Sequence, residues 1–216
     1  DIPQPPAEPV TKLGTIWQLG RHRLICGDSH DAATVDRLLA GAKADMVFTD
    51  PPYGMNLDTD YTQMGSNRKY DKVIADDKQY DASFILSYFD YCPEIFLWGA
   101  DYYVETLGRQ YPKLGSWIVW DKYSDDERTG LLDGKFGSGR VHPTQKPAAL
   151  AKWFFRRWAK PNGIVVDLYG GSGSTLIACE QTERTCYMAE LDPKYCDVIV
   201  KRWELLTGQK AQQLNG

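Results

Sequence analysis

Residues 163–193 read GIVVDLYGGSGSTLIACEQTERTCYMAELDP, and this stretch decides the fold. It consists of an apolar run typical of a buried strand, a glycine turn, a helical segment from Ser174 and a second strand that ends in an acid. Gly171 and Gly173 let the backbone turn sharply and approach a ligand closely, with the amino terminus of the helix behind them. The stretch therefore predicts a strand-helix-strand unit with a ligand site at its turn.

Apolar strands and helices alternate over the rest of the chain as well. The pattern predicts a hairpin-like pair over 16–26, a helix over 32–39, a strand over 46–49, a helix from 81, a strand over 95–99, a helix from 101, a strand over 116–120, a helix over 148–160 and a last helix from 193. Such alternation indicates a mostly parallel sheet covered on both faces. We therefore predict an α/β fold with a Rossmann-like, doubly wound sheet, in which ligands bind at the carboxyl ends of the strands.

Length and charge limit the class of protein. The chain has 216 residues and a formal net charge of −4 at pH 7. We expect a single domain over residues 13–216 after a flexible, proline-rich lead over residues 1–12. The acidic balance is no global signature of nucleic-acid binding, so such a partner would need local basic patches. No apolar run approaches about 18 residues and no signal-like start is visible, so we expect a cytoplasmic protein without a membrane partner.

The five cysteines are Cys26, Cys92, Cys179, Cys186 and Cys196. They are odd in number, lie in or beside apolar runs, and show neither CxxC spacing nor neighbouring histidine clusters. We expect buried apolar side chains in a reducing compartment rather than a disulfide or zinc framework, and no metal site.

The acids around the glycine turn indicate which cofactor it binds. Glu190 follows Asp167 by 23 residues, where an acid at the end of the second strand accepts hydrogen bonds from ribose hydroxyls. A dinucleotide fingerprint from Gly171 needs a glycine at position 176, which is Leu176. Asp167 would repel a pyrophosphate but attract a cationic methionyl amine. S-adenosylmethionine therefore fits better than NAD, although the turn alone is also compatible with a purely structural role.

A second stretch, ADMVFTDPPYGMN at residues 44–56, ends a buried strand at Asp50, Pro51, Pro52 and Tyr53. Prolines end a strand because they lack a ladder donor. That explanation leaves the carboxylate before them and the ring after them unexplained, unless Asp50 only caps a turn and Tyr53 only fills the core.

The two stretches together resemble the β-class amino-methyltransferases of DNA, in which a D-P-P-Y motif precedes an F/Y-x-G-x-G motif. LICGDS (24–29), RVHPTQKP (140–147) and AELDPKY (189–195) agree with this family, and the resemblance extends over about residues 24–209. It implies transfer of a methyl group from S-adenosylmethionine to an exocyclic amine of a base flipped out of double-stranded DNA. A homodimer and a role in site-specific restriction-modification are further expectations from the family.

The DPPY motif supplies the catalytic candidates Asp50, Pro51, Pro52 and Tyr53. Asp50 and the carbonyl of Pro51 each accept an N–H bond of the target amine, which favours a pyramidal nitrogen with an available lone pair. The prolines fix these acceptors in advance, and Tyr53 offers a face for base stacking.

The resemblance also implies cofactor contacts. Asp28 matches the acid at the adenine, Glu190 the acid at the ribose, and Thr144 and Lys146 the segment that closes the pocket. The full set of cofactor-binding candidates is Asp28, Asp50, Thr144, Lys146, Asp167, Tyr169, Gly171, Ser172, Gly173, Ser174, Thr175 and Glu190.

The choice of target is less defined. Aspartate rather than serine at position 50 resembles the adenine-modifying members, so we expect methylation of the adenine 6-amino group. The cytosine 4-amino group or an RNA amine stays open, as does a nucleotide-binding module without catalysis, which would not need Asp50.

Two long polar stretches flank these motifs. Residues 54–80 are expected to form a mobile loop on the target side. Residues 122–141 stand where the family carries its target-recognition region. They are short for that role, which indicates either relaxed sequence choice or missing residues near Asp126 and Gly130.

Overall fold

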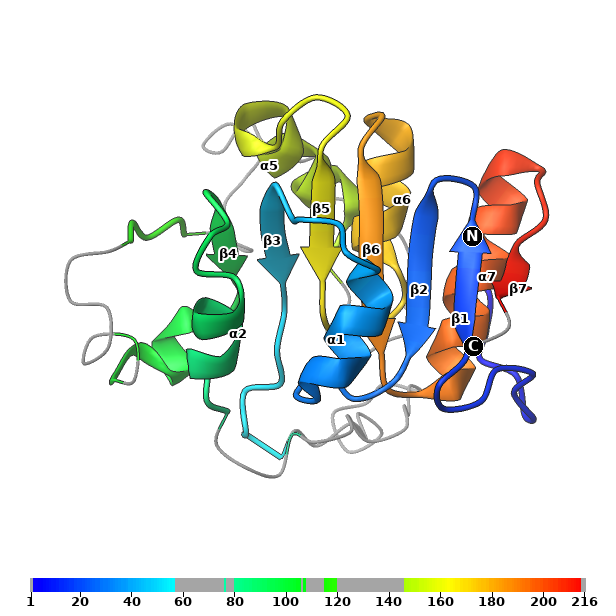
Figure 1. Cartoon of the computed structure of the whole chain (residues 1–216), viewed down its shortest axis with the longest axis horizontal. Helices are drawn as coiled ribbons and strands as arrows, with labels where there is room; N and C mark the ends of the chain where they lie inside the picture. The colour runs from blue at the N-terminus through cyan, green and yellow to red at the C-terminus, as the bar shows by residue number, and fades with distance from the viewer. Residues whose placement is uncertain are drawn as a thin grey trace, which may run out of the picture.

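The computed structural model describes residues 2–56, 76, 80–105, 107, 115–119 and 146–214. Its strands form one seven-stranded sheet, which helices cover (Figure 1). The strand order is β4-β3-β5-β6-β2-β1-β7. The strands are β1 Ile16–Leu19, β2 His22–Cys26, β3 Met46–Thr49, β4 Ile95–Leu97, β5 Ile164–Asp167, β6 Thr185–Glu190 and β7 Gln212–Leu214.

Strands β4, β3, β5, β6 and β2 pair in parallel, whereas β1 pairs antiparallel with both β2 and β7. In the parallel part, Asp167 lies opposite Met188, and Cys26 lies opposite Glu190. The carboxyl ends of β2, β3, β5 and β6 therefore meet at one edge of the sheet, which is the lower edge in Figure 1.

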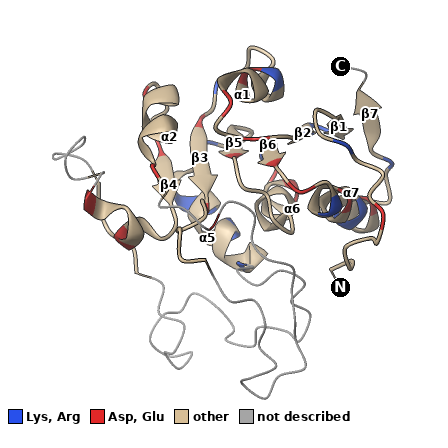
Figure 2. Cartoon of the chain, turned by 90° about the horizontal axis from the view of Figure 1, so that it is seen from below, with Lys and Arg blue, Asp and Glu red and all other residues tan. Residues whose placement is uncertain are grey.

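Helices cover both faces of the sheet (Figure 2). Helices α1 Ala32–Leu39 and α2 Ser83–Tyr88 lie on one face, and α5 Ala148–Trp158, α6 Ser174–Gln181 and α7 Pro193–Thr207 lie on the other. Each face buries its own apolar cluster, because the strands between them are apolar on both sides. The predicted α/β, doubly wound fold is confirmed.

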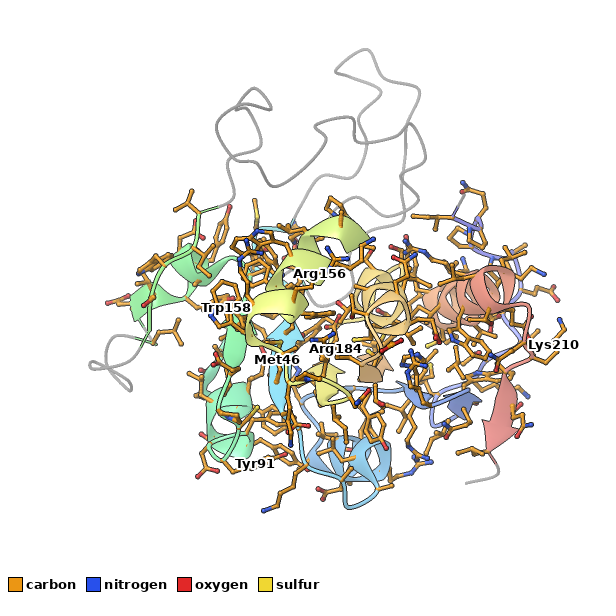
Figure 3. The ribbon with its side chains drawn as sticks, turned by 90° about the horizontal axis from the view of Figure 1, so that it is seen from above. Met46, Tyr91, Arg156, Trp158, Arg184 and Lys210 are labelled. Carbon is orange, nitrogen blue, oxygen red and sulfur yellow. The ribbon has the colours of Figure 1, made fainter. Side chains whose placement is uncertain are left out.

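Arg184 links helix α5 to strand β6 of the sheet. Arg184, at the start of β6, donates from Nη2 to the carbonyls of Phe155 (3.3 Å) and Ala159 (3.0 Å) at the end of α5. Figure 3 shows Arg184 near Met46 at the amino-terminal end of the parallel strands. The bonds satisfy carbonyls that the end of a helix leaves without an internal donor.

Most predicted elements are present with slightly shorter bounds, and two differ. The strand predicted over 116–120 is wrong for the residues that the structure describes, since 115–119 form no strand. Trp117 and Val119 are 63% and 82% exposed. An apolar run forms a strand only where a neighbouring edge pairs with it, and these residues make no ladder with β4. Strand β7 was not predicted, because QQL has no apolar pattern. The helix expected from 101 begins with a 3₁₀-helix, η2 Ala100–Tyr102, and residues 104, 105 and 107 after it are helical.

The end of the predicted lead over residues 1–12 contacts helix α7. Thr11 is 2% exposed, and its hydroxyl and amide both donate to Asp197 of α7. The amide of Val10 donates to the same carboxylate at 2.6 Å, and Trp17 Nε1 donates to the Thr11 hydroxyl. Val10 and Thr11 are therefore hydrogen-bonded to helix α7.

Two expectations from composition can be compared with the structure. All five cysteines are free and buried, as predicted. Within the described residues, none of the helices is long and apolar enough to cross a membrane.

His22 is a fully buried titratable group at the start of β2. Its Nδ1 accepts from the amide of Cys186 (2.9 Å), so Nε2 carries the proton and donates to Glu180 (2.9 Å). Glu180 also accepts from Trp203 Nε1 at 2.8 Å. Burial lowers the pKa of His22 to about 4, although Glu180 acts in the opposite direction. The fold therefore holds the neutral imidazole.

This shift predicts a loss of stability in mild acid. The folded-state pKa lies below the unfolded value, so the contribution of His22 is complete above pH 6.5 and is lost as the pH falls towards 4. The free energy of unfolding should fall by about 3 kcal/mol, since each pKa unit corresponds to roughly 1.4 kcal/mol. The free energy of unfolding of wild type and of His22→Gln is measured in urea between pH 4.5 and 7.5. The difference between the two plots of this free energy against pH gives the contribution of His22. His30→Gln, which changes an exposed histidine, should leave the wild-type curve unaltered.

Candidate active site

A pocket lies at the carboxyl ends of β2, β3, β5 and β6, where a doubly wound sheet binds its ligands. The structure brings most of the predicted site residues together in its lining, namely Asp28, Asp50, Pro51, Pro52, Tyr53, Lys146, Asp167, Tyr169, Gly171, Ser172, Ser174, Thr175 and Glu190. Gly173 lies in the turn beside this lining. Thr144 lies outside the described residues, as do most of the stretches 54–80 and 122–141.

The carboxylate of Asp50 lies directly after β3 and has a partner on each oxygen. The Tyr53 hydroxyl donates to Oδ1 at 2.5 Å, and the Lys146 ammonium donates to Oδ2. The side chains of Lys146 and Asp50 are 19% and 20% exposed. Because the ammonium neutralises the carboxylate at close range, Asp50 is held as an oriented hydrogen-bond acceptor.

Lys146 lines the pocket and also contacts the DPPY corner. The sequence assigned it to the closure of the cofactor pocket. In the structure its Nζ contacts Asp50, lies 3.4 Å from the Tyr53 hydroxyl and stands 5.4 Å from the centre of the Trp98 ring. Lys146 lines the pocket from the side of the DPPY corner.

The ring of Tyr53 packs against a second tyrosine. It stacks on Tyr102 with 4.8 Å between the ring centroids and 6° between the planes. Gly99 makes room for it, since a Cβ there would come within 2.1 Å of Tyr53 Cε1. Burial, with Asp50 nearby, raises the pKa of Tyr53 well above its usual range, so the hydroxyl stays protonated. One face of this ring is therefore covered by Tyr102.

The glycine turn is held from both sides. Gly171 and Gly173 have left-handed backbones (φ 51° and 81°), and a Cβ on Gly173 would come within 3.0 Å of Ile199. Arg202 of α7 donates to the carbonyl of Ser172 (2.8 Å) and the hydroxyl of Ser174 (3.3 Å). Burial lowers the pKa of Arg202 to about 10, which leaves it charged at pH 7.

Asp167 joins the glycine turn to the DPPY corner. It is 4% exposed, and its Oδ1 accepts from the Thr49 hydroxyl (2.9 Å) and the Tyr169 amide (3.1 Å). The Thr49 hydroxyl in turn accepts from the Leu168 amide at 3.0 Å. Burial raises the pKa of Asp167 to about 7, and the charge of Asp50 contributes to the rise. The residue before Asp50 is thereby bonded to the start of the turn.

Glu190 ends β6 and faces the same turn. Its Oε2 accepts from the Gly171 amide at 2.6 Å, and its Oε1 accepts from the Asp192 amide at 2.8 Å. Burial raises its pKa to about 7 in spite of these two donors. The carboxylate is therefore fixed in orientation and sensitive to pH near neutrality.

Carboxylates dominate the charge of the pocket. Among the described residues its lining includes Asp28, Asp50, Asp76, Asp167, Glu190 and Asp192, with Lys146 as the one lysine or arginine. Figure 2 shows acidic segments at the ends of β5 and β6. Such a lining attracts a cationic ligand and repels a pyrophosphate.

The sequence did not point to several residues of this site: Thr49, Asp76, Trp98, Tyr102 and Arg202. Asp76, Trp98, Tyr102 and Arg202 lie far along the chain from the motifs that they contact, so no local pattern could have assigned them. Thr49 adjoins the DPPY motif, and its hydroxyl in an otherwise apolar strand was a signal that could have been used.

Comparison with known proteins finds similarity to DNA methylases. Residues 109–201 match the N6_N4_Mtase family model, described as DNA methylase. The match contains the glycine turn and Glu190 but not the DPPY corner. The Type II methyltransferase M.PvuII of Proteus hauseri is 34% identical over 74 residues, which are 33% of this chain and 22% of that protein. The putative methylase YubD of Escherichia coli (strain K12) is 37% identical over 65 residues, 30% of this chain and 29% of that protein.

A solved structure entitled PvuII DNA methyltransferase (cytosine-N4-specific) is similar at 16% identity and a TM-score of 0.49. The similarity covers 94% of this chain and 90% of that one. The curated relatives are matched over less than a third of their own length.

Proposed function

We propose that this protein is a site-specific DNA methyltransferase that transfers a methyl group from S-adenosylmethionine to the 6-amino group of adenine. The observation that carries the proposal is that Asp50 of the DPPY corner and the glycine turn with Glu190 line one pocket. A module that only binds a nucleotide needs the turn and Glu190, but it has no use for a fixed acceptor beside them.

The residues of the pocket fit this cofactor. Glu190 would accept from the ribose hydroxyls, Asp28 would contact the adenine, and Gly171 would allow close approach beside the turn, where a Cβ would meet no atom within 4 Å. The acidic lining favours a ligand that carries a sulfonium and an ammonium group over one with a pyrophosphate. When bound, S-adenosylmethionine supplies an activated methyl group.

The chain contributes orientation and electrostatics to the reaction. Asp50 and the carbonyl of Pro51 would each accept an N–H of the target amine, which favours a pyramidal nitrogen whose lone pair is no longer delocalised into the ring. Pro51 and Pro52 fix the backbone that carries these acceptors, so they need no reorganisation during the reaction. Asp50 would then receive the proton that the methylated nitrogen releases and pass it to solvent. The base has to leave the helical stack to reach this corner.

One experiment tests the function and the choice of base. Purified protein is incubated with S-adenosylmethionine and unmethylated DNA of mixed sequence, and the digested nucleosides are identified by mass spectrometry. 6-Methyl-2′-deoxyadenosine supports the proposal. 4-Methyl-2′-deoxycytidine would move the target to the cytosine amine, which the same two acceptors also suit. Retained cofactor binding without any product would instead indicate the non-catalytic module.

Lys146→Met provides a prediction for the DPPY corner. Loss of one charge-assisted hydrogen bond to Asp50 should slow single-turnover methyl transfer about tenfold, because Asp50 loses its fixed orientation. The dissociation constant of S-adenosylmethionine, measured by calorimetry, should stay constant or fall, since a cation leaves a pocket that binds a cation. A tenfold rise in that constant would assign Lys146 to the cofactor instead, as the sequence had suggested.

A further inference from the structure

Asp76 contacts the DPPY corner although it follows Tyr53 by more than twenty residues. It is 6% exposed and lines the pocket. Its Oδ1 accepts from the amides of Tyr53 (2.9 Å), Gly54 (2.8 Å) and Met55 (3.4 Å). Its own carbonyl accepts from the amide of Asn56 at 2.6 Å. One residue therefore receives four consecutive backbone donors.

The backbone after the two prolines needs such a partner. Residues 53–56 leave the sheet at the end of β3, so their amides have no ladder acceptor and a buried amide without a partner is costly. Gly54 and Asn56 have left-handed backbones, with φ of 73° and 46°. Successive amides that converge on one point form a concave anion site, and here a carboxylate of the same chain occupies it.

The contacts continue from Asp76 to the proposed acceptor. Asp76 holds the backbone of Tyr53, and the Tyr53 hydroxyl donates to Asp50 Oδ1 at 2.5 Å. The prolines stiffen the corner on the side before Tyr53, but they do not restrain the chain after it. Without Asp76, the Tyr53 ring and its hydroxyl would lose their fixed position relative to Asp50.

We propose that Asp76 is a positioning residue for methyl transfer, which sets the backbone of residues 53–55 and, through Tyr53, the orientation of Asp50. The proposal rests on the proposed function for its effect on rate. It does not rest on that function for its effect on the backbone, which is measurable in a protein without any activity.

The test compares Asp76→Ala and Asp76→Asn with wild type. Asp76→Ala should slow single-turnover methyl transfer to unmethylated DNA by about 10- to 100-fold and leave the dissociation constant of S-adenosylmethionine within about threefold. Asp76→Asn keeps an oxygen that accepts the same amides, so it should recover most of the rate. Hydrogen exchange of amides 53–55, followed by mass spectrometry, should accelerate in Asp76→Ala and much less in Asp76→Asn.

Asp45→Ala is the matched control. Asp45 also accepts a backbone amide, that of Ile164 at 2.9 Å, but it lies before β3 at the opposite end of the strand from the pocket. This variant should lower the melting temperature without changing the rate or the exchange of amides 53–55.

The outcomes separate the two proposals. An active wild type with an Asp76→Ala rate within threefold, or with exchange unchanged, overturns the role of Asp76. A rate loss explained entirely by weaker cofactor binding overturns it as well. If wild type methylates no DNA, the proposed function fails, and the exchange of amides 53–55 alone decides whether Asp76 holds this backbone.

Discussion

Asp50→Ala is expected to lower the single-turnover rate of methyl transfer to DNA by about 10²- to 10³-fold, which is typical for loss of a preorganised hydrogen-bonding group. The physical reason is that the target amine loses its charged acceptor, so its nitrogen stays conjugated with the ring and its lone pair stays delocalised. The measurement is a rapid-quench time course with enzyme in excess over DNA and saturating labelled S-adenosylmethionine.

Cofactor affinity has to be measured on the same variant. Asp50 would act on the amine, so the dissociation constant of S-adenosylmethionine should stay within a few-fold, roughly 1 kcal/mol or less. A modest weakening is expected, because Asp50→Ala leaves the Lys146 ammonium without its carboxylate in a pocket that binds a cation. The double variant Asp50→Ala with Lys146→Met should remove this weakening while the rate stays low.

Asp101→Asn is the control for a charge near the corner. Asp101 is an exposed carboxylate close enough to Tyr53 to contribute to its raised pKa, but it does not line the pocket. Its neutralisation should leave the rate unchanged. Equal losses of rate and cofactor affinity in Asp50→Ala, or a loss of rate in Asp101→Asn, would contradict the role assigned to Asp50.

Sequence periodicity was sufficient for the fold because the central strands are apolar on both sides. Segments 46–49, 164–167 and 185–190 lie between two layers of helices, so their burial is visible in the sequence itself. Periodicity failed at the sheet edges. Residues 115–119 are apolar but unpaired, and 212–214 are polar but paired with β1. Pairing at an edge depends on which neighbour is available, and local composition does not contain that information.

In the candidate site, too, some residues could be predicted from the sequence and others could not. Asp50, Tyr53, Gly171 and Glu190 could be predicted because each belongs to a short motif at the end of a strand, and parallel strands bring their carboxyl ends together. The partners that orient these residues could not. The ion pair between Lys146 and Asp50 and the bonds from Asp76 join segments that come together only in the fold.

Glu190→Ala should have the largest effect on the cofactor. A charged hydrogen bond contributes about 1.5 to 3 kcal/mol, so the dissociation constant of S-adenosylmethionine should rise about 10- to 150-fold. The variant also removes the acceptor of the Gly171 and Asp192 amides, which loosens the turn and acts in the same direction. Calorimetry measures the constant, and the rate at saturating cofactor should recover most of its wild-type value.

Glu204→Ala is the matched control for Glu190→Ala. Glu204 likewise accepts a backbone amide, that of Ala211 at 3.1 Å, but it lies on α7 outside the pocket at the β-strand ends. It should not change cofactor affinity. An unchanged dissociation constant in Glu190→Ala would remove the ribose contact from the proposal.

The raised pKa of Glu190 adds a pH dependence with a definite sign. Its pKa is about 7, chiefly because of burial, so a fraction of the carboxyl is protonated at neutral pH. Hydroxyl donors prefer the ionised form, so the cofactor should bind more weakly as the pH falls, by up to about tenfold per unit below pH 7 for each proton that must leave. Asp167, whose pKa is also about 7, should add to this slope because a cationic ligand favours its ionised form. The glutamine of Glu190→Gln cannot ionise, so cofactor binding by this variant should keep only the pH dependence that Asp167 contributes. If the dissociation constant of the wild type does not change from pH 8 to pH 6, neither Glu190 nor Asp167 releases a proton when the cofactor binds.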